Sequence, residues 1–370
     1  MDITPLSPPA QPASSTGDAG NWFPENLTRI SELLAQIAFH PATVRPVAVF
    51  DFDNTCIFRD VGQAVFCHQL HHLHYRLTPE QLTAILPRPE GQLAGRPLAA
   101  IIAALTDSYR TLFPLLLAGR NTQARLLPQA RLFAALLLWF TVQARKDDRL
   151  GPLYVLPFMT KLLAGFTTSE LRFLAMDVVQ AAAMEPLDEE TLAVEAPEPV
   201  GRIEASYPRG LHSHPEMLEL MHWLAGKGIE RYVISASAEW LIEGAAKWLG
   251  FPVETDHIFG IRVRLDTGDV LTISDQAAYP VTFREGKNEI IRRWIGIHPI
   301  LVAGDADTDY EMLTLPGIDI RLLLNRQQHG LIATLYEDPR ILLQGLNLTT
   351  GRFRPARESI RESFQLAKPI

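Results

Sequence analysis

The sequence predicts an α/β protein with a parallel β-sheet and a long helical insertion. The first observation is a short apolar run that ends in Asp51 and Asp53. A buried parallel strand presents such carboxylates at its carboxyl end, where open α/β sheets bind their ligands. The second observation is that two later apolar runs, 231–234 and 300–304, also end in polar residues. The third is the segment 61–199, which shows little strand alternation and much Leu, Ala, Gln and Arg.

Asp51 and Asp53 give the strongest chemical signal in the chain. Residues two apart in a strand project to the same face, so we expect the two carboxylates to lie side by side. One can attack as a nucleophile or hold a divalent cation, while the other exchanges protons with a leaving group. Thr55 completes a D-x-D-x-T pattern. Aspartates at strand ends also cap turns, so the other motifs decide between the two interpretations.

Three further polar motifs follow in a fixed order. A strand-like run ends in Ser235, with small neighbours that let backbone N–H groups approach an anion. Lys287 supplies a positive charge just before a helical stretch. A third apolar run ends in Asp305, and Asp309 follows four residues later. The chain therefore carries carboxylates, a hydroxyl and a lysine after successive predicted strands.

Taken in order, these motifs resemble those of the haloacid dehalogenase (HAD) superfamily, over residues 44–60 and 215–325. The resemblance implies a HAD-type Rossmannoid parallel sheet with an inserted α-helical C1-type cap, which closes over the substrate. A narrower resemblance, to the phosphoserine phosphatase-like and phosphorylcholine phosphatase-like branch, rests on the segments 232–239, 258–260 and 285–287.

Asp60 lies nine residues after Asp51, at the start of the predicted cap. In phosphoserine enzymes the acidic residue at this position contacts the amino group of the substrate. A helix dipole also favours an acidic residue at a helix start, so a capping role for Asp60 stays open. One departure from the branch is Thr308, which precedes Asp309 where Asn is common.

The resemblance implies a Mg²⁺-dependent phosphatase that hydrolyses a small phosphate monoester through an aspartyl-phosphate intermediate. Asp51 would attack phosphorus, and Asp53 would protonate the leaving oxygen and then activate water. Mg²⁺ suits such a site because it prefers oxygen ligands. In the expected site, Asp51 and Asp53 are the catalytic residues, and the metal ligands are Asp51, Asp53 (through its backbone carbonyl) and Asp305. Phosphate and substrate are bound by Thr55, Ser235, Lys287 and Asp60. Asp309 orients Lys287 or a metal-bound water.

The favoured substrate is an amino-alcohol phosphate, either phosphoserine or phosphocholine. A quaternary ammonium group would require an aromatic cage, for which Trp139, Tyr154 and Phe158 lie in the cap region. Two other functions stay open: a phosphotransferase or mutase that uses the same aspartyl-phosphate, and a catalytically idle HAD-fold binding module. The full acidic set favours the enzyme.

Several of these residues also have ordinary structural explanations. Asp305 and Asp309 can cap a turn and a helix, and Ser235 can be a polar strand end, with Ser237 as its rival for phosphate. Lys287 can be a solvated surface lysine. The His68–His74 cluster has helical spacing that suits metal ligation, but a cap helix without a metal is the favoured interpretation.

Composition restricts the function classes. The chain has 370 residues, of which 47% are hydrophobic, and a net charge of −8, which argues against a general nucleic-acid surface. Its densest apolar run, 132–142, is shorter than the roughly 20 residues that a membrane span needs. Two cysteines, Cys56 and Cys67, imply no disulfide framework. We therefore expect a cytoplasmic protein that binds neither nucleic acid nor membrane, and the resemblance implies a small-molecule phosphate monoester as its ligand; the oligomeric state is not predicted.

The expected organisation has four parts and several local features. The parts are a disordered N-terminal lead (1–20), a HAD core domain (21–60 and 208–350), a helical cap domain (61–207) and a C-terminal tail (351–370). The local features are a helix at Asn26–Phe39, capping boxes at Thr167/Glu170 and Ser213/Glu216, a loop at 185–199, a hairpin at 262–272 and a surface helix from about Arg352.

Overall fold

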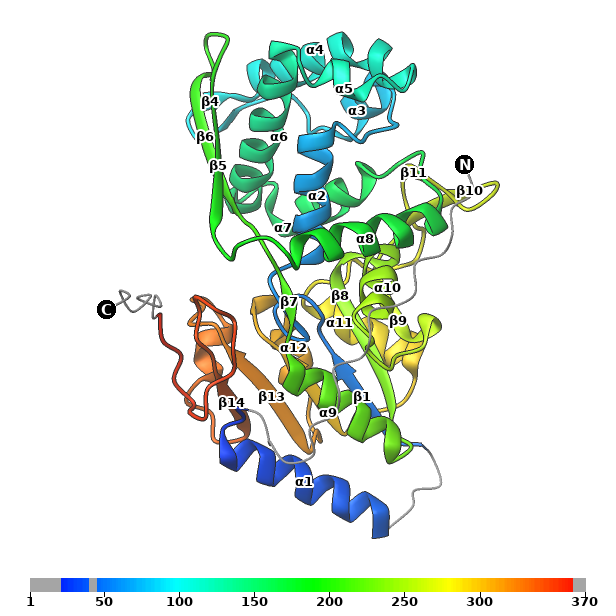
Figure 1. Cartoon of the computed structure of the whole chain (residues 1–370), viewed down its shortest axis with the longest axis vertical. Coiled ribbons are helices and arrows are strands. Elements are labelled where there is room, and N and C mark those ends of the chain that lie inside the picture. Colours follow the sequence, from blue (N-terminus) through cyan, green and yellow to red (C-terminus); the bar gives the residue numbers. More distant parts are fainter. Residues whose placement is uncertain (1–20, 40–44, 362–370) are drawn as a thin grey trace, which may run out of the picture.

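Figure 1 shows the computed structural model of the chain, which describes residues 21–39 and 45–361. Its centre is a six-stranded sheet in which every neighbouring pair of strands is parallel. The strand order is β14-β13-β12-β1-β8-β9. The α/β fold class is therefore confirmed, whereas the expected lead, 1–20, lies outside the described residues. The strands are β1 (Val47–Phe50), β8 (Glu230–Ala238), β9 (Ile258–Ile261), β12 (Leu301–Gly304), β13 (Ile320–Asn325) and β14 (Ile341–Gly345).

β1 lies in the middle of the sheet, between β8 and β12. All four of its residues are buried, as expected for a strand that is covered on both faces. Ala48 and Phe50 pack in one hydrophobic cluster, and Val47 and Val49 pack in another on the opposite face. The helices of the first face are α1 (Pro24–Phe39), α9 (Pro215–Gly226) and α10 (Glu239–Trp248), and those of the second are α11 (Glu285–Ile290), its π-helical continuation η2 (Ile291–Ile295) and α12 (Tyr310–Leu313).

A helical cap is inserted between β1 and β8 and forms the upper half of Figure 1. It has a hydrophobic cluster of its own, which includes Leu70, Leu105, Phe133 and Phe158. The inserted helical cap of the predicted fold is therefore confirmed. Its helices are α2 (Val61–His72), α3 (Pro79–Ile85), α4 (Leu98–Leu117), α5 (Asn121–Ala124), α6 (Pro128–Lys146), α7 (Gly151–Lys161) and α8 (Thr168–Ala182).

Helix α8 lies within the inserted segment but packs on the sheet domain. Its apolar side chains, such as Leu171 and Val178, belong to the same cluster as α10, and the two helices lie one above the other in Figure 1. Arg172 of α8 donates to Glu243 of α10 at 2.5 Å. The helix begins with the expected capping box of Thr167 and Glu170. The inserted segment is thus fastened to the sheet domain along one whole helix.

The expected hairpin is present as β10 (Val263–Asp266) and β11 (Val270–Asp275). It also holds the chain just before α8, because Gly165 and Leu271 are joined by a 2.9 Å backbone hydrogen bond, as are Leu271 and Phe166. The remaining short elements are β2 (Ile57–Phe58), paired with β7 (His212–Ser213), β3 (Gln92–Leu93), paired with β4 (Arg96–Pro97), and the single turns η1 (Thr255–His257), η3 (Asp307–Asp309) and η4 (Ile332–Leu335).

Three local predictions are wrong. The segment 185–199 is not a loop, because β5 (Glu189–Ala196) pairs with β6 (Gly201–Pro208) in an antiparallel hairpin. Its alternate residues, such as Ile203, Ala205 and Tyr207, pack into the cap cluster. Ser213 does not cap a helix: it pairs within β7, and α9 follows from His214 without a side-chain cap.

The predicted tail helix is also absent from the described part of the tail, 352–361. This segment instead runs back along the edge of the sheet domain, where Phe353 stacks edge-on against Trp22 at 5.1 Å between ring centroids. Ser359 accepts a hydrogen bond from the backbone of Leu346 at 2.7 Å. Backbone hydrogen bonds between Gly345 and Ala356 and between Leu348 and Ile360, each at 2.8 Å, add to these side-chain contacts, so the described tail is held without a helix.

One described helix, α4, is long and apolar enough to cross a membrane by length and composition. Its 18-residue apolar window is 44% buried inside the protein. The buried face includes Ile101, Leu105 and Leu112, which belong to the hydrophobic cluster of the cap. One face of α4 therefore packs against the rest of the cap.

Candidate active site

The carboxyl end of β1 delivers two buried carboxylates. Asp51 is 4% exposed and Asp53 is 9% exposed. The chain turns sharply after them, with Asn54 in the left-handed region at φ 64°. Thr55 follows this turn, and its hydroxyl donates to Asp51 Oδ2 at 3.0 Å. The local sequence therefore forms a compact polar loop at the middle of the sheet edge.

Lys287 is wholly buried and joins two of the predicted carboxylates. Its Nζ donates to Asp51 Oδ1 and to Asp309 Oδ1, each at 2.6 Å. Burial alone would lower the pKa of Lys287, but the charges of Asp309 and Asp51 outweigh it and raise that pKa above its ordinary value. Lys287 is therefore a buried ammonium ion and not a solvated surface lysine.

Asp309 has both oxygens engaged. Oδ1 accepts from Lys287, while Oδ2 accepts from the backbone N–H groups of Asp305 and Ala306 at 3.0 and 3.2 Å. These bonds fix the turn that follows β12 and hold Lys287 against Asp51. These are the contacts that an orienting residue would make, and that role stays a prediction for Asp309.

A set of carboxylate oxygens suitable for a divalent cation lies at the same point. Oxygens of Asp51, Asp305 and Asp309 lie within 4.8 Å of one another, and all three residues are buried. Thr55 Oγ1 lies between Asp51 Oδ2 and Asp305 Oδ1, at 3.0 and 3.3 Å. Hard oxygen donors of this kind fit Mg²⁺. Because Asp309 is already saturated, Asp51 and Asp305 are the side chains best placed to hold the ion.

The pKa of Asp51 also fits a cation at this point. Burial raises this pKa well above its ordinary value, the negative charge of Asp309 adds to the rise, and Lys287 opposes it. An ionised Asp51 is needed for nucleophilic attack, and a nearby divalent cation favours the ionised form. The surroundings of Asp51 therefore favour binding of further positive charge.

Asp53 is held by a different set of donors. Its Oδ2 accepts from Ser237 Oγ at 2.7 Å and from Ser235 Oγ at 3.2 Å, and its Oδ1 accepts from the backbone of Val61 at 2.8 Å. Burial, followed by the negative charge of Asp60, raises the pKa of Asp53 to about 8. A carboxyl group with this pKa carries a proton at neutral pH and can donate it, as a general acid must.

Ser235 and Ser237, both in β8, differ in their exposure to the cavity. Ser235 is fully buried, where its hydroxyl bonds Asp53 and accepts from the backbone of Ser237 at 3.0 Å. Ser237 is partly exposed and lines the cavity above the carboxylates. Ser237, which the sequence offered as the rival of Ser235 for phosphate, is therefore the serine that a ligand in the cavity would meet.

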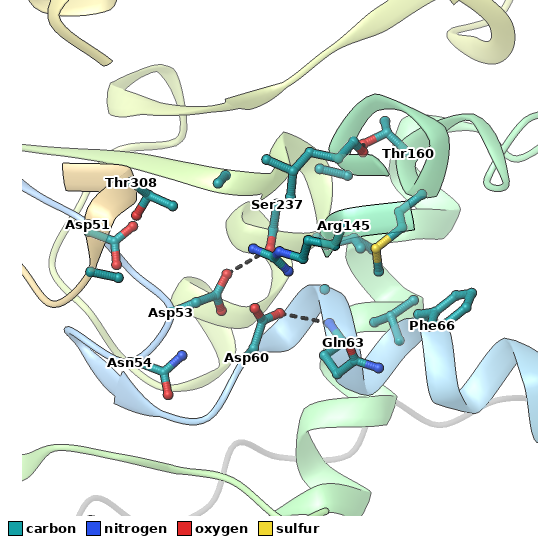
Figure 2. A pocket seen from close by; sticks show the side chains of 18 of the residues that line it. Asp51, Asp53, Asn54, Asp60, Gln63, Phe66, Arg145, Thr160, Ser237 and Thr308 are labelled. Atoms are coloured by element: carbon teal, nitrogen blue, oxygen red, sulfur yellow. Dashed lines mark hydrogen bonds between the residues drawn. The ribbon is translucent and has the colours of Figure 1, made fainter. Parts of the chain in front are cut away.

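A cavity of about 130 Å³ lies over these residues, between the sheet edge and the cap. Figure 2 shows that Asp51 and Asp53 line one side and that Arg145, Phe66 and Thr160 reach in from the cap. The cavity therefore lies at the interface between the sheet domain and the cap. Its remaining polar lining residues are Asn54, Asp60, Gln63, Gln69, Ser237, Asp305, Thr308 and Arg326.

Asp60 has the capping role that the sequence left open, and it also lines the cavity. It is the N-cap of α2, where Oδ1 accepts from the backbone of Gln63 at 2.7 Å. It also lines the cavity, close to Asp53 and facing Arg145 in Figure 2. A capping bond thus holds the carboxylate of Asp60 at the cavity wall.

Sequence reasoning missed two arginines of the cavity. Arg145 comes from the last turn of α6, and its guanidinium points toward Asp53, Asp60 and Ser237 in Figure 2. Arg326 follows β13 and donates to Asp305 Oδ2 at 2.5 Å. Neither arginine belongs to a recognisable motif. Each reaches the site only because folding brings distant elements together, so the sequence around it gives no signal.

The proposed aromatic cage does not line this cavity. Trp139, Tyr154 and Phe158 pack in the hydrophobic cluster of the cap, and Tyr154 donates to the backbone of Ile85 at 2.9 Å. Phe66 is the aromatic residue among those that line the cavity. The histidine cluster is likewise separate: among the described residues, the group of three ligands close enough to share an ion consists of aspartates alone.

Comparison of the sequence with models of protein families identifies the family of this chain. The model of the haloacid dehalogenase-like hydrolases matches residues 126–314, which is about half of the chain. The chain belongs to this family. The matched stretch contains Ser235, Lys287, Asp305 and Asp309, and Asp51 of this HAD hydrolase lies before it.

A solved structure shows the same fold. A conserved protein of unknown function from Anaerococcus prevotii DSM 20548 is similar over 93% of this chain and 98% of its own, with a TM-score of 0.80 and 23% identity. A phosphoserine phosphohydrolase-like protein from Francisella tularensis subsp. tularensis SCHU S4 shares 13% identity over 76% of this chain and 87% of its own, with a TM-score of 0.32. No curated protein matches the sequence of this HAD hydrolase.

Proposed function

We propose that this HAD hydrolase is a Mg²⁺-dependent phosphatase that hydrolyses a small phosphate monoester through an aspartyl-phosphate on Asp51. The observation that carries the proposal is the pairing of Asp51, held by Lys287 at 2.6 Å, with a neighbouring Asp53 whose raised pKa keeps it protonated. Two-step phosphate ester hydrolysis requires an ionised nucleophile and a protonated general acid. Because burial raises the pKa of Asp51 as well, the positive charges of Lys287 and of a bound divalent cation would be needed to keep Asp51 ionised.

In the first step a carboxylate oxygen of Asp51 forms a bond to phosphorus while the bond from phosphorus to the ester oxygen breaks. Asp53 transfers its proton to that leaving oxygen, and an alcohol departs. Ser237, which donates to Asp53 Oδ2 at 2.7 Å, and Val61 hold the carboxyl group in place for this transfer. Lys287 stays beside Asp51 and offsets the negative charge of the phosphoryl oxygens.

In the second step Asp53, now a carboxylate, takes a proton from water. The oxygen of that water attacks phosphorus, and the bond between phosphorus and Asp51 breaks to give inorganic phosphate and free Asp51. Bound Mg²⁺ would supply charge neutralisation of the phosphoryl oxygens, with Asp51, the backbone carbonyl of Asp53 and Asp305 as its protein ligands. The hydroxyl of Thr55 is hydrogen-bonded to Asp51, and that of Ser235 to Asp53.

A phosphate-release assay tests the proposal. We expect release of phosphate from p-nitrophenyl phosphate with Mg²⁺, no release after EDTA treatment, and recovery when Mg²⁺ is added back. Ca²⁺ should inhibit, because it accepts more ligands at longer distances and would misalign Asp51. Full activity in EDTA would contradict the metal requirement. Transfer of the phosphoryl group to an added alcohol without phosphate release would instead indicate the phosphotransferase, and no turnover at all would indicate a binding module.

The cavity favours phosphoserine over phosphocholine as the substrate. Asp60 presents a carboxylate, and Arg145 presents a guanidinium that has no ion-pair partner among the described residues. A zwitterionic leaving group would place its ammonium against Asp60 and its carboxylate against Arg145. Phosphocholine has no carboxylate, and the cavity offers no aromatic cage for its quaternary ammonium.

Free buried thiols at Cys56 and Cys67 support a cytoplasmic location.

Substitutions at the two charged cavity residues should separate substrate recognition from chemistry. We expect Asp60→Asn and Arg145→Gln each to lower kcat/KM for phosphoserine at least tenfold, which corresponds to about 1.4 kcal/mol. The value for p-nitrophenyl phosphate, which has neither charged group, should change little. Arg110→Gln, on an exposed cap helix face, is the matched control. Equal losses on both substrates would show that the two residues act on structure or chemistry and would remove the support for an amino-acid phosphate.

A further inference from the structure

Arg326 is a cation of the cavity that the proposed mechanism does not use. Its Nη1 donates to Asp305 Oδ2 at 2.5 Å, and its side chain is 26% exposed against 3% for that of Asp305. It also lines the cavity. One side of the guanidinium therefore touches the carboxylate at the end of β12, and the rest borders the space in which a ligand would bind.

The other oxygen of Asp305 turns toward Asp51. Thr55 Oγ1 lies 3.3 Å from this oxygen, Oδ1, and 3.0 Å from Asp51 Oδ2, so the single proton of the hydroxyl is shared between the two carboxylates. Asp51 Oδ1 is taken by Lys287. Each of these two carboxylates thus has one oxygen held by a basic side chain and one directed to the other carboxylate. A divalent cation that binds both would share Asp305 with Arg326.

The charges of the site show what Arg326 contributes. Three buried carboxylates, Asp51, Asp305 and Asp309, face two buried or half-buried cations. Lys287 is committed to Asp51 and Asp309. Arg326 is therefore the cation that offsets the charge of Asp305.

We propose that Arg326 sets the affinity of the carboxylate site for divalent cations by competing with them for Asp305. The inference rests on the proposed function, because it takes Asp305 as a metal ligand. Two cations that are attracted to one carboxylate repel each other, so the binding of one weakens the binding of the other. Loss of the arginine charge should therefore strengthen cation binding, whereas a residue that only supports the fold would weaken it or leave it unchanged.

Calorimetric titration of the full-length, EDTA-treated and dialysed protein with Mg²⁺ tests this directly. We expect Arg326→Gln to bind Mg²⁺ at least about fivefold more tightly than the wild type, the lower end of typical couplings between sites. Arg326→Lys, which keeps the charge, should stay near the wild-type Kd. Arg340→Gln removes an exposed ion pair with Asp338 outside the cavity and should have no effect. As a second readout, Mg²⁺ should raise the Tm of Arg326→Gln more than that of the wild type.

The possible failures are distinguishable. If the wild type binds Mg²⁺ and a folded Arg326→Gln protein binds it equally or more weakly, the inference is wrong and the proposed function stands. If Arg326→Gln leaves the Kd for Mg²⁺ unchanged but raises KM for substrate at saturating Mg²⁺, Arg326 is a substrate contact and the inference is again wrong. If neither protein binds Mg²⁺, the metal requirement of the proposed function fails together with the inference.

Discussion

Asp51→Asn is expected to lower kcat at least about a thousandfold while the protein stays folded. The amide has nearly the same shape as the carboxylate, but it is a poor nucleophile and cannot form the aspartyl-phosphate. Lys287 keeps Asp309 as a partner at 2.6 Å, so the buried ammonium is not left alone. The measurements are kcat with p-nitrophenyl phosphate, together with the circular dichroism spectrum and Tm.

A matched control separates this loss from a general effect of removing a carboxylate. Asp319 is exposed and lies just before β13, away from the cavity, so Asp319→Asn should keep full activity. A residual rate for Asp51→Asn above about a tenth of the wild-type rate would rule out Asp51 as the nucleophile, because loss of a nucleophile costs far more.

Lys287→Met is expected to lower the free energy of unfolding by about 3–5 kcal/mol, the usual result of breaking a buried ion pair by removing one partner. Lys287 is wholly buried and is the ammonium shared by Asp51 and Asp309. Methionine fills a similar volume but leaves both carboxylates without that partner. Activity should also be lost, because the charge beside the nucleophile is gone.

Urea denaturation at neutral pH measures this change. Lys247→Met, at an exposed position of α10, is the control and should alter the free energy of unfolding by less than about 0.5 kcal/mol. A Lys287→Met protein as stable as the wild type would show that the two short ion pairs do not stabilise the fold and that Lys287 serves chemistry alone.

The sequence was a good guide wherever local pattern determines structure. The apolar run before Asp51 had to be a strand buried on both faces, and it is the middle strand of the sheet. Parallel strands share one carboxyl edge, so the residues that end β1 and β12, together with Ser235 near the end of β8, could be expected to meet. The capping box at Thr167 was readable for the same reason, because its hydrogen bonds join residues three apart.

The remaining features depend on tertiary packing. Arg145 and Arg326 come from the ends of a cap helix and a distant strand, and nothing near them in the sequence marks them as cavity residues. The β5–β6 hairpin escaped notice because acidic residues and prolines obscured its alternating apolar positions. Trp139 and Phe158 could be placed in the cap but not oriented, and they face its interior rather than the cavity.

The attachment of α8 to α10 has a consequence for how substrate range can change. The apolar contacts of α8 and the Arg172–Glu243 ion pair belong to the sheet domain, whereas Arg145 belongs to a helix of the separate cap cluster. Substitutions around Arg145 would therefore disturb a different hydrophobic core from the one that supports Asp51. Mutations that select a new leaving group can accumulate on one side of the cavity while the proposed machinery of phosphoryl transfer on the other side is inherited intact.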